Sequence, residues 1–169
     1  VGIHTETPAM PLHVLTGGGS ANRYAIRIQN MSVPSNVWDI GVDNESPDTD
    51  LLFAYKGTYK AAIDEDGTYQ KGSDKALKKN IKALAPALEK VMKLKPCTYQ
   101  YKASVTGRTN IGMIAQEVEK YFPQVVRKKE FYTLDYNGFG VIAIKAIQEQ
   151  QELINQLKKE IKEIKKSIG

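Results

Sequence analysis

Isoleucine recurs every seventh residue near the end of this chain. These isoleucines, with one further position in each interval, form a seam along a helix. Its members are Ile147, Gln150, Ile154, Leu157, Ile161, Ile164 and Ile168. A heptad seam flanked by Lys and Glu is typical of a coiled coil, and isoleucine at its first position favours more than two strands. We therefore predict a long helix over residues 137–169 in a parallel homotrimer. The alternative is one amphipathic helix packed on its own domain, but about three turns extend beyond any sequence able to cover them.

The segment between residues 73 and 137 mixes helical and strand patterns. Apolar residues at helical spacing follow Ser73 as far as Leu84, and Pro86 suits the first turn of a second short helix. The further predicted elements are a strand over 97–102, an amphipathic helix over 111–122 stopped by Pro123, and a hairpin with strands over 124–129 and 131–136. Asn137 is the predicted cap of the last helix.

Residues 1–72 have the pattern of short strands. Apolar runs rich in β-branched and aromatic residues span 24–30, 37–43 and 51–57, and turn-forming clusters divide them. Strands this short bury little in one chain, so we expect them to pack on an upstream segment or on copies of themselves. The predicted fold class is α+β, with a fibre-like β module over 1–72 and a mixed α/β module over 73–169.

The net charge changes sign between these two modules. Residues 1–72 carry 5 Lys/Arg and 9 Asp/Glu, whereas residues 73–169 carry 19 and 10. The lysines of the basic module are spread among glutamates without interleaved aromatic residues, so a nucleic-acid partner is not expected. The sequence has no transmembrane run and no secretory signal, and we expect no membrane partner. Because it has no initiator methionine, we expect a piece of a longer chain.

Few residues are suited to bind a metal. The chain has two histidines, His4 and His13, and one cysteine, Cys97. None of them has a cysteine or carboxylate neighbour at the spacing that metal sites use. We therefore predict no metal and no cofactor.

Ser73 and Lys78 allow two interpretations. Serine or aspartate before a helical run is a common N-cap, so Ser73 or Asp74 would cap a helix. Alternatively, a serine paired with a neutral lysine acts as a nucleophile with lysine as its general base. Burial or nearby positive charge favours the neutral form of a lysine, and three further lysines crowd Lys78. Water screens exposed charges, however, so the residues alone leave both interpretations open.

Four stretches of the second module carry a family resemblance: residues 73–81, 87–102, 111–126 and 134–149. In this order they resemble the C-terminal intramolecular chaperone domain of endosialidases and of related phage tail spikes, tail fibres and neck appendages. The resemblance extends from Ser73 to about Ile154. Residues 1–14 also resemble a segment that precedes C-terminal β hairpins in trimeric phage fibres and bacterial surface adhesins.

The resemblance implies a self-cleaving serine endopeptidase. In that family a serine that opens the domain and a lysine five residues later form the catalytic dyad, which places these roles on Ser73 and Lys78 and the cut at Gly72–Ser73. The domain trimerises, folds the upstream β fibre of the same chain, and is then released from the virion component by its own cut. Homotrimer partners and the upstream segment are therefore the expected partners.

Four further residues match recurrent family positions and are predicted to support the site: Asp74, Gln116, Glu117 and Asp135. We expect structural roles for them, as a cap or in hydrogen bonds between elements or subunits. The alternative function is an uncleaved trimeric fibre tip or host-binding module without enzymatic activity.

Overall fold

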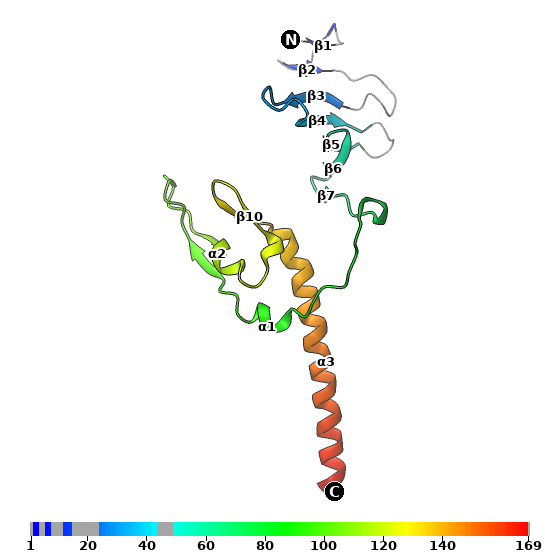
Figure 1. Cartoon of the computed structure of the whole chain (residues 1–169), viewed down its shortest axis with the longest axis vertical. Coiled ribbons are helices and arrows are strands. Elements are labelled where there is room, and N and C mark those ends of the chain that lie inside the picture. The colour runs from blue at the N-terminus through cyan, green and yellow to red at the C-terminus, as the bar shows by residue number, and fades with distance from the viewer. Residues whose placement is uncertain (1, 4–5, 8–11, 15–23, 44–48, 169) are drawn as a thin grey trace. The chain divides into compact units, whose positions relative to one another are not determined.

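The computed structural model describes residues 2–3, 6–7, 12–14, 24–43 and 49–168. Its contacts divide the chain into two compact units, Val1–Ile81 and Lys82–Gly169. Strands dominate the first unit, and the second combines short helices, two hairpins and one long helix (Figure 1). The predicted α+β class is confirmed. The module boundary between residues 72 and 73 and the trimeric coiled coil stay predictions.

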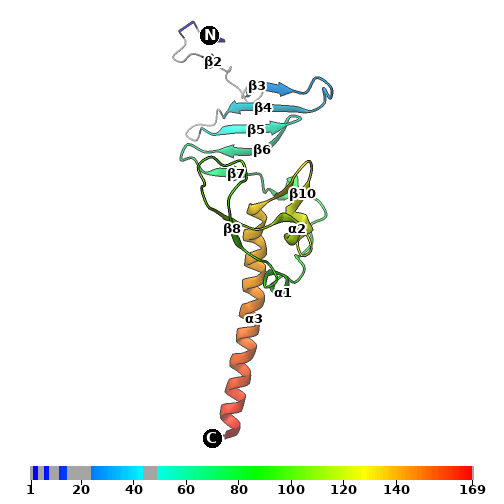
Figure 2. The same cartoon turned by 90° about the vertical axis from the view of Figure 1, so that its left-hand side faces the viewer.

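The first unit contains a five-stranded antiparallel sheet whose strands follow chain order (Figure 2). The strands are β3 (Tyr24–Gln29), β4 (Val37–Val42), β5 (Leu51–Tyr55), β6 (Thr58–Ile63) and β7 (Tyr69–Lys71). A separate parallel pair joins β1 (Gly2–Ile3) to β2 (His13–Val14). The predicted strands over 24–30, 37–43 and 51–57 are confirmed as β3, β4 and β5. β6 and β7 have no counterpart among the predicted strands. For β7 the reason is that it is short and polar and shows no apolar alternation.

The sheet leaves one apolar face open in the single chain. Ile28 lies opposite Trp38, which lies opposite Tyr55, so these three side chains share a face. The rings of Trp38 and Tyr55 are 5.2 Å apart, yet Trp38 and Ile28 remain 44% and 57% exposed. On the other face Asp39 is buried, and Arg27 Nε donates to its Oδ1 at 2.7 Å. Apolar side chains left in water favour association, as the sequence predicts for these strands.

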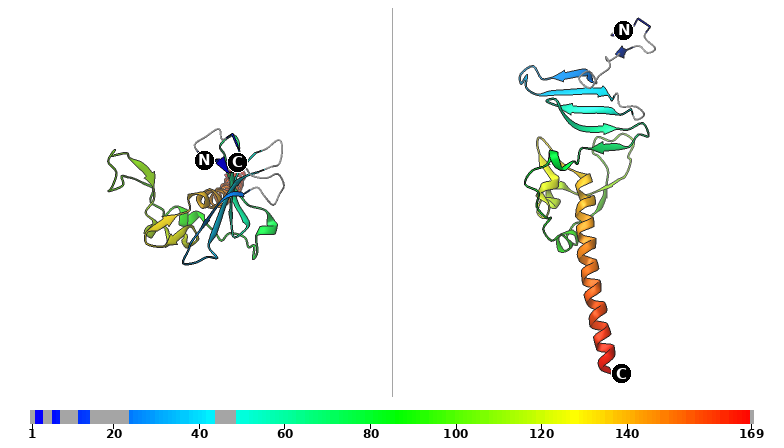
Figure 3. Two further views of the ribbon diagram at one scale, coloured as in Figure 1. Left: turned by 90° about the horizontal axis from the view of Figure 1, so that it is seen from above. Right: turned by 90° about the vertical axis from the view of Figure 1, so that its right-hand side faces the viewer.

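In the second unit, short elements lead to a 33-residue helix. They are α1 (Leu88–Val91), β8 (Cys97–Tyr99), β9 (Asn110–Gly112), α2 (Ala115–Val118), the 3-10 turn η2 (Pro123–Val125), β10 (Val126–Lys128), β11 (Tyr132–Leu134) and α3 (Tyr136–Ile168). β8 pairs with β9 and β10 with β11, both antiparallel. The β8–β9 hairpin extends away from α3 (Figure 3). The short helix after Pro86, the hairpin over 124–136 and the long helix are confirmed. The strand predicted over 97–102 is confirmed only for its first half, Cys97–Tyr99.

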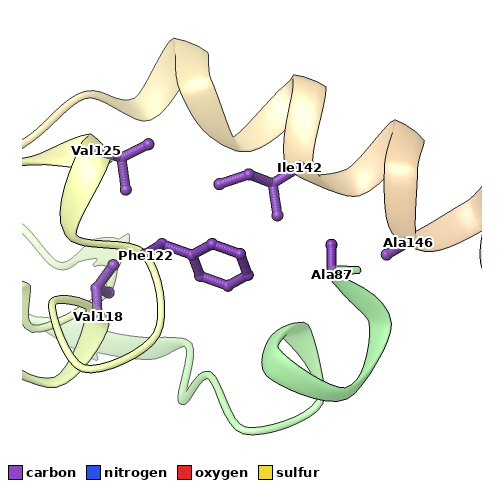
Figure 4. Packing of buried hydrophobic residues seen from close by; sticks show 6 residues of the cluster. All are labelled: Ala87, Val118, Phe122, Val125, Ile142 and Ala146. Carbon is purple, nitrogen blue, oxygen red and sulfur yellow. The ribbon is translucent and has the colours of Figure 1, made fainter. Parts of the chain in front are cut away.

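The core of the second unit lies where α3 meets the short elements. Val118, Phe122 and Val125 face Ile142 and Ala146 of α3, and Ala87 closes the end of the cluster (Figure 4). All six are at most 5% exposed. Gly138 permits this packing, because a Cβ there would lie 2.6 Å from Val125 Cγ1.

The helix predicted to start at Ser73 is wrong. Only a 3-10 turn forms, η1 (Lys75–Leu77), after which Lys78 is extended and Asn80 takes a left-handed conformation with φ of 56°. The apolar residues of this segment bury little surface in the single chain, since Leu77 is 56% and Ile81 63% exposed. An isolated short helix without a buried face is marginal in water, which explains the difference.

The amphipathic helix predicted over 111–122 is also too long. Its first residues form β9 instead, where Gly112 pairs with Cys97 of β8, and α2 holds only four residues. A Cβ on Gly112 would lie 2.5 Å from the Tyr136 hydroxyl, so glycine permits this close approach. Asn137 does not cap α3, since it is the second residue of that helix. The preceding Asp135 accepts a bond from Gly138 N through its backbone carbonyl.

Glu149 of α3 caps α1 from 61 residues away. Its carboxylate accepts hydrogen bonds from Leu88 N at 2.8 Å and from Ala87 N at 3.0 Å, and Lys145 Nζ lies 3.3 Å from its other oxygen. These bonds, the one from Leu88 above all, hold the pKa of Glu149 below its usual value. The carboxylate thus ties the start of α1 to α3.

Beyond this core, α3 is a single unpaired helix. Its seam side chains are exposed, with Ile154 at 38%, Leu157 at 56% and Ile161 at 51%. Within the described residues, no helix is both long and apolar enough to cross a membrane. An apolar stripe on a polar helix of this length points to partner helices.

Candidate functional site

The candidate site lies in the first unit, directly after the last strand of the sheet. β7 ends at Lys71, and three residues later Asp74 caps η1 by accepting a hydrogen bond from Ala76 N at 2.6 Å. The turn closes when Lys78 N donates to the Lys75 carbonyl at 3.1 Å. Asp74 therefore has the capping role, and this leaves the Ser73 hydroxyl free of it.

The Ser73 hydroxyl instead meets the amine of Lys78. Lys78 Nζ donates to Ser73 Oγ at 2.7 Å, and both residues are exposed in the single chain. A general base must lie about 2.6–3.2 Å from the proton-bearing atom, so this distance also suits a neutral amine that accepts the hydroxyl proton. The structure thus brings together the two residues predicted to form the dyad; their catalytic role stays a prediction.

The predicted scissile bond joins Gly72 to Ser73. Gly72 is half-buried and sits between two side chains: a Cβ on it would lie 3.2 Å from Leu77 Cδ1 and 3.2 Å from Tyr59 Cε1. Neither neighbour of Gly72 is evident from the sequence. No spacing rule links Tyr59 to residue 72, because their contact depends on how β6 and β7 pair.

The other three predicted supporting residues belong to the second unit. Gln116 and Glu117 are exposed on α2, and Gln116 lines an aromatic groove of about 460 Å³ together with Tyr101, Phe131 and other residues. Asp135 is half-buried, and its backbone N–H donates to the Val125 carbonyl at 2.8 Å. Their role in supporting the site stays a prediction.

Metal ligands do not gather in the described part of the chain. Among those residues, no group of three or more His, Cys, Asp or Glu side chains could hold a metal ion. Cys97 is a free, half-buried thiol. His4 lies outside the described residues.

Comparisons with known proteins give one family match and several relatives. Residues 73–127 match the family described as chaperone of endosialidase, which is classed with the peptidases. The long tail fiber protein Gp37 of Enterobacteria phage M1 is 37% identical over 123 residues, covering 66% of this chain and 49% of that protein. Gp37 of phage Ox2 is 36% identical over 125 residues, with the same coverage, and Gp37 of Salmonella phage S16 is 33% identical over 104 residues, 55% of this chain and 14% of that protein.

The chain spans about half the length of the first two relatives. No solved structure matches it. The predicted resemblance is confirmed: residues 73–127 match the chaperone of endosialidase family, and the chain is similar to long tail fiber proteins of phages.

Proposed function

We propose that this chain is a trimeric intramolecular chaperone that registers and folds an upstream β-rich phage fibre or appendage and then releases itself by cutting at Gly72–Ser73. The observation that carries the proposal is the 2.7 Å contact of Lys78 Nζ with Ser73 Oγ, one residue after a glycine. The relation to phage tail-fibre proteins supports a place in the virion for the upstream product.

The cut proceeds by acyl transfer within the chain. Ser73 Oγ bonds to the Gly72 carbonyl carbon, and its proton passes to Lys78 Nζ. The carbon–nitrogen bond between Gly72 and Ser73 then breaks, and the freed nitrogen takes that proton, which leaves an ester. Water hydrolyses the ester, so Gly72 ends in a carboxylate and Ser73 regains its hydroxyl.

Assembly is the proposed trigger of this chemistry. Lys78 accepts a proton only as the neutral amine, and removal of water around a lysine favours that form. Because Ser73 and Lys78 are exposed in the single chain, neighbouring chains must cover them in the trimer. The exposed seam of α3 supplies the surface through which the chains associate.

A C-terminal chaperone solves a folding problem of the upstream strands. β strands shared between chains form non-local contacts slowly, and their open edges and faces favour misassembly. Helices of a coiled coil form from local contacts, and their association raises the effective concentration of the strands that they follow. After the cut the assembled fibre is kinetically trapped, because the registering device is no longer attached.

Intact-mass measurement of freshly purified protein tests the proposal. Wild type should give two fragments, residues 1–72 and 73–169, whereas Ser73→Ala and Lys78→Ala should each give one full-length mass. Lys79→Ala is the matched control and should cut like wild type. Cleavage that persists in Ser73→Ala refutes the dyad, and an uncut wild type favours the uncleaved fibre tip.

A further inference from the structure

The residue before the proposed cut is held between two side chains of the same unit. A methyl group at Gly72 would lie 3.2 Å from Leu77 Cδ1, and 3.2 and 3.3 Å from two ring carbons of Tyr59. These distances are shorter than normal contacts between carbon atoms. The space around Gly72 therefore excludes any larger side chain unless Tyr59 or Leu77 moves.

The two neighbours come from opposite directions along the chain. Tyr59 belongs to β6, which pairs with β7 through Ala61 and Lys71, so the ring reaches the chain just after β7 ends. Leu77 is the last residue of η1, the turn that brings Lys78 back to Ser73. One wall of the site is thus part of the fibre sheet, and the other is part of the turn that carries the proposed base.

The environment of each side chain fits a contact of this kind. Tyr59 is half-buried, and burial raises the pKa of its phenol, with a smaller contribution from Asp50. Leu77 is 56% exposed, and its Cδ1 lies beside Gly72.

We propose that Tyr59 and Leu77 are positioning residues that hold the Gly72–Ser73 bond beside the Ser73 hydroxyl, and that they make the cut depend on a formed β6–β7 hairpin. This inference rests on the proposed self-cleavage. A chain whose sheet has not formed lacks the Tyr59 wall, so its scissile bond is free to rotate away from the attacking oxygen. The site then cuts only a chain whose last strand pair is in place. The same packing explains why residue 72 is glycine, because Tyr59 and Leu77 leave no room for a larger side chain.

A double-mutant cycle at positions 72 and 77 tests the packing. Gly72→Ala should slow the first-order appearance of fragments several-fold, because Tyr59 or Leu77 must give by a few tenths of an ångström and the reacting bond shifts with them. Leu77→Ala in the same background makes room for the methyl group, so the double variant should cut faster than Gly72→Ala alone. Gly72→Ala cutting at the wild-type rate, or a double variant no faster than Gly72→Ala, overturns the proposal.

Variants of Tyr59 test the coupling to the sheet. Tyr59→Phe keeps the ring and should cut at the wild-type rate, whereas Tyr59→Ala should cut slowly although its trimer mass is unchanged. Lys60→Ala is the matched control, since Lys60 adjoins Tyr59 on β6 and is exposed. Wild-type cutting by Tyr59→Ala refutes the coupling alone, because the self-cleavage would still require Ser73. An uncut wild type instead refutes the proposed function. If Tyr59→Ala does not fold, the cycle at positions 72 and 77 still decides the matter.

Discussion

Lys78 Nζ lies 2.7 Å from Ser73 Oγ because the chain between these residues is not a continuous helix. In an α-helix, residues five apart point about 140° away from each other, since each residue turns the chain by about 100°. The short η1 turn, followed by an extended Lys78, brings the amine back to the hydroxyl instead. The Ser73–Lys78 contact therefore requires that the predicted helix does not form.

Loss of the Asp74 cap should slow the cut. Asp74→Ala removes the acceptor of Ala76 N, and such caps contribute about 1 kcal/mol, so η1 should open more often and carry Lys78 away from Ser73. We expect a rate several-fold below wild type on a denaturing gel time course. Asp74→Asn keeps an acceptor oxygen and should cut close to the wild-type rate. Equal rates for Asp74→Ala and wild type would show that the cap does not position the dyad.

Charges in the seam of α3 should prevent both assembly and cutting. Ile154→Asp with Ile161→Asp places carboxylates where the helices of a trimer would meet, and light scattering should then report a monomer that stays full length. Asn155→Asp with Lys162→Asp is the matched control, because both positions lie off the seam; it should remain trimeric and cut. A monomeric seam variant that still cuts contradicts the role of assembly as trigger.

Glu149 should make the stability of the second unit depend on pH. Its folded-state pKa lies below the ordinary value of 4.5, chiefly because Leu88 N donates to the carboxylate. The stabilisation is therefore complete above pH 4.5 and is lost as the pH falls through the lower folded-state value. Urea unfolding at constant protein concentration should show wild type more stable than Glu149→Gln near neutral pH, with the difference shrinking in acid.

The exposed Glu163→Gln is the control for this pH dependence. It should follow the wild-type curve across the same range. A difference between wild type and Glu149→Gln that does not change with pH would mean that the carboxylate charge has no part in capping α1.

Truncation of Phe122 should destabilise the second unit strongly. Its ring is 2% exposed at the contact between the short elements and α3, and burial of this kind makes Phe→Ala cost about 3–5 kcal/mol. The midpoint of urea unfolding measures the loss. Phe131→Ala is the matched control: this ring is 75% exposed, and the change should stay within about 0.5 kcal/mol. Equal effects of the two substitutions would contradict the assigned core.

Local patterns in the sequence predict much of this protein. The isoleucine repeat predicts the long helix, alternating apolar runs predict β3 to β5, and the spacing of Ser73 and Lys78 within the family resemblance points to the candidate pair. Each of these signals lies within a short stretch of sequence. In the helix and the strands, the periodicity shows directly which face of the element is apolar.

Contacts between distant residues were decided only by the tertiary structure. The capping of α1 by Glu149, the pairing of Gly112 with Cys97 and the approach of Tyr59 to Gly72 join segments that no local pattern relates. The same contacts explain the errors: strand pairing replaced part of one predicted helix, and the lack of a covering surface reduced another to a turn. Helical periodicity states which residues would share a face, but a short helix forms only where tertiary packing covers that face.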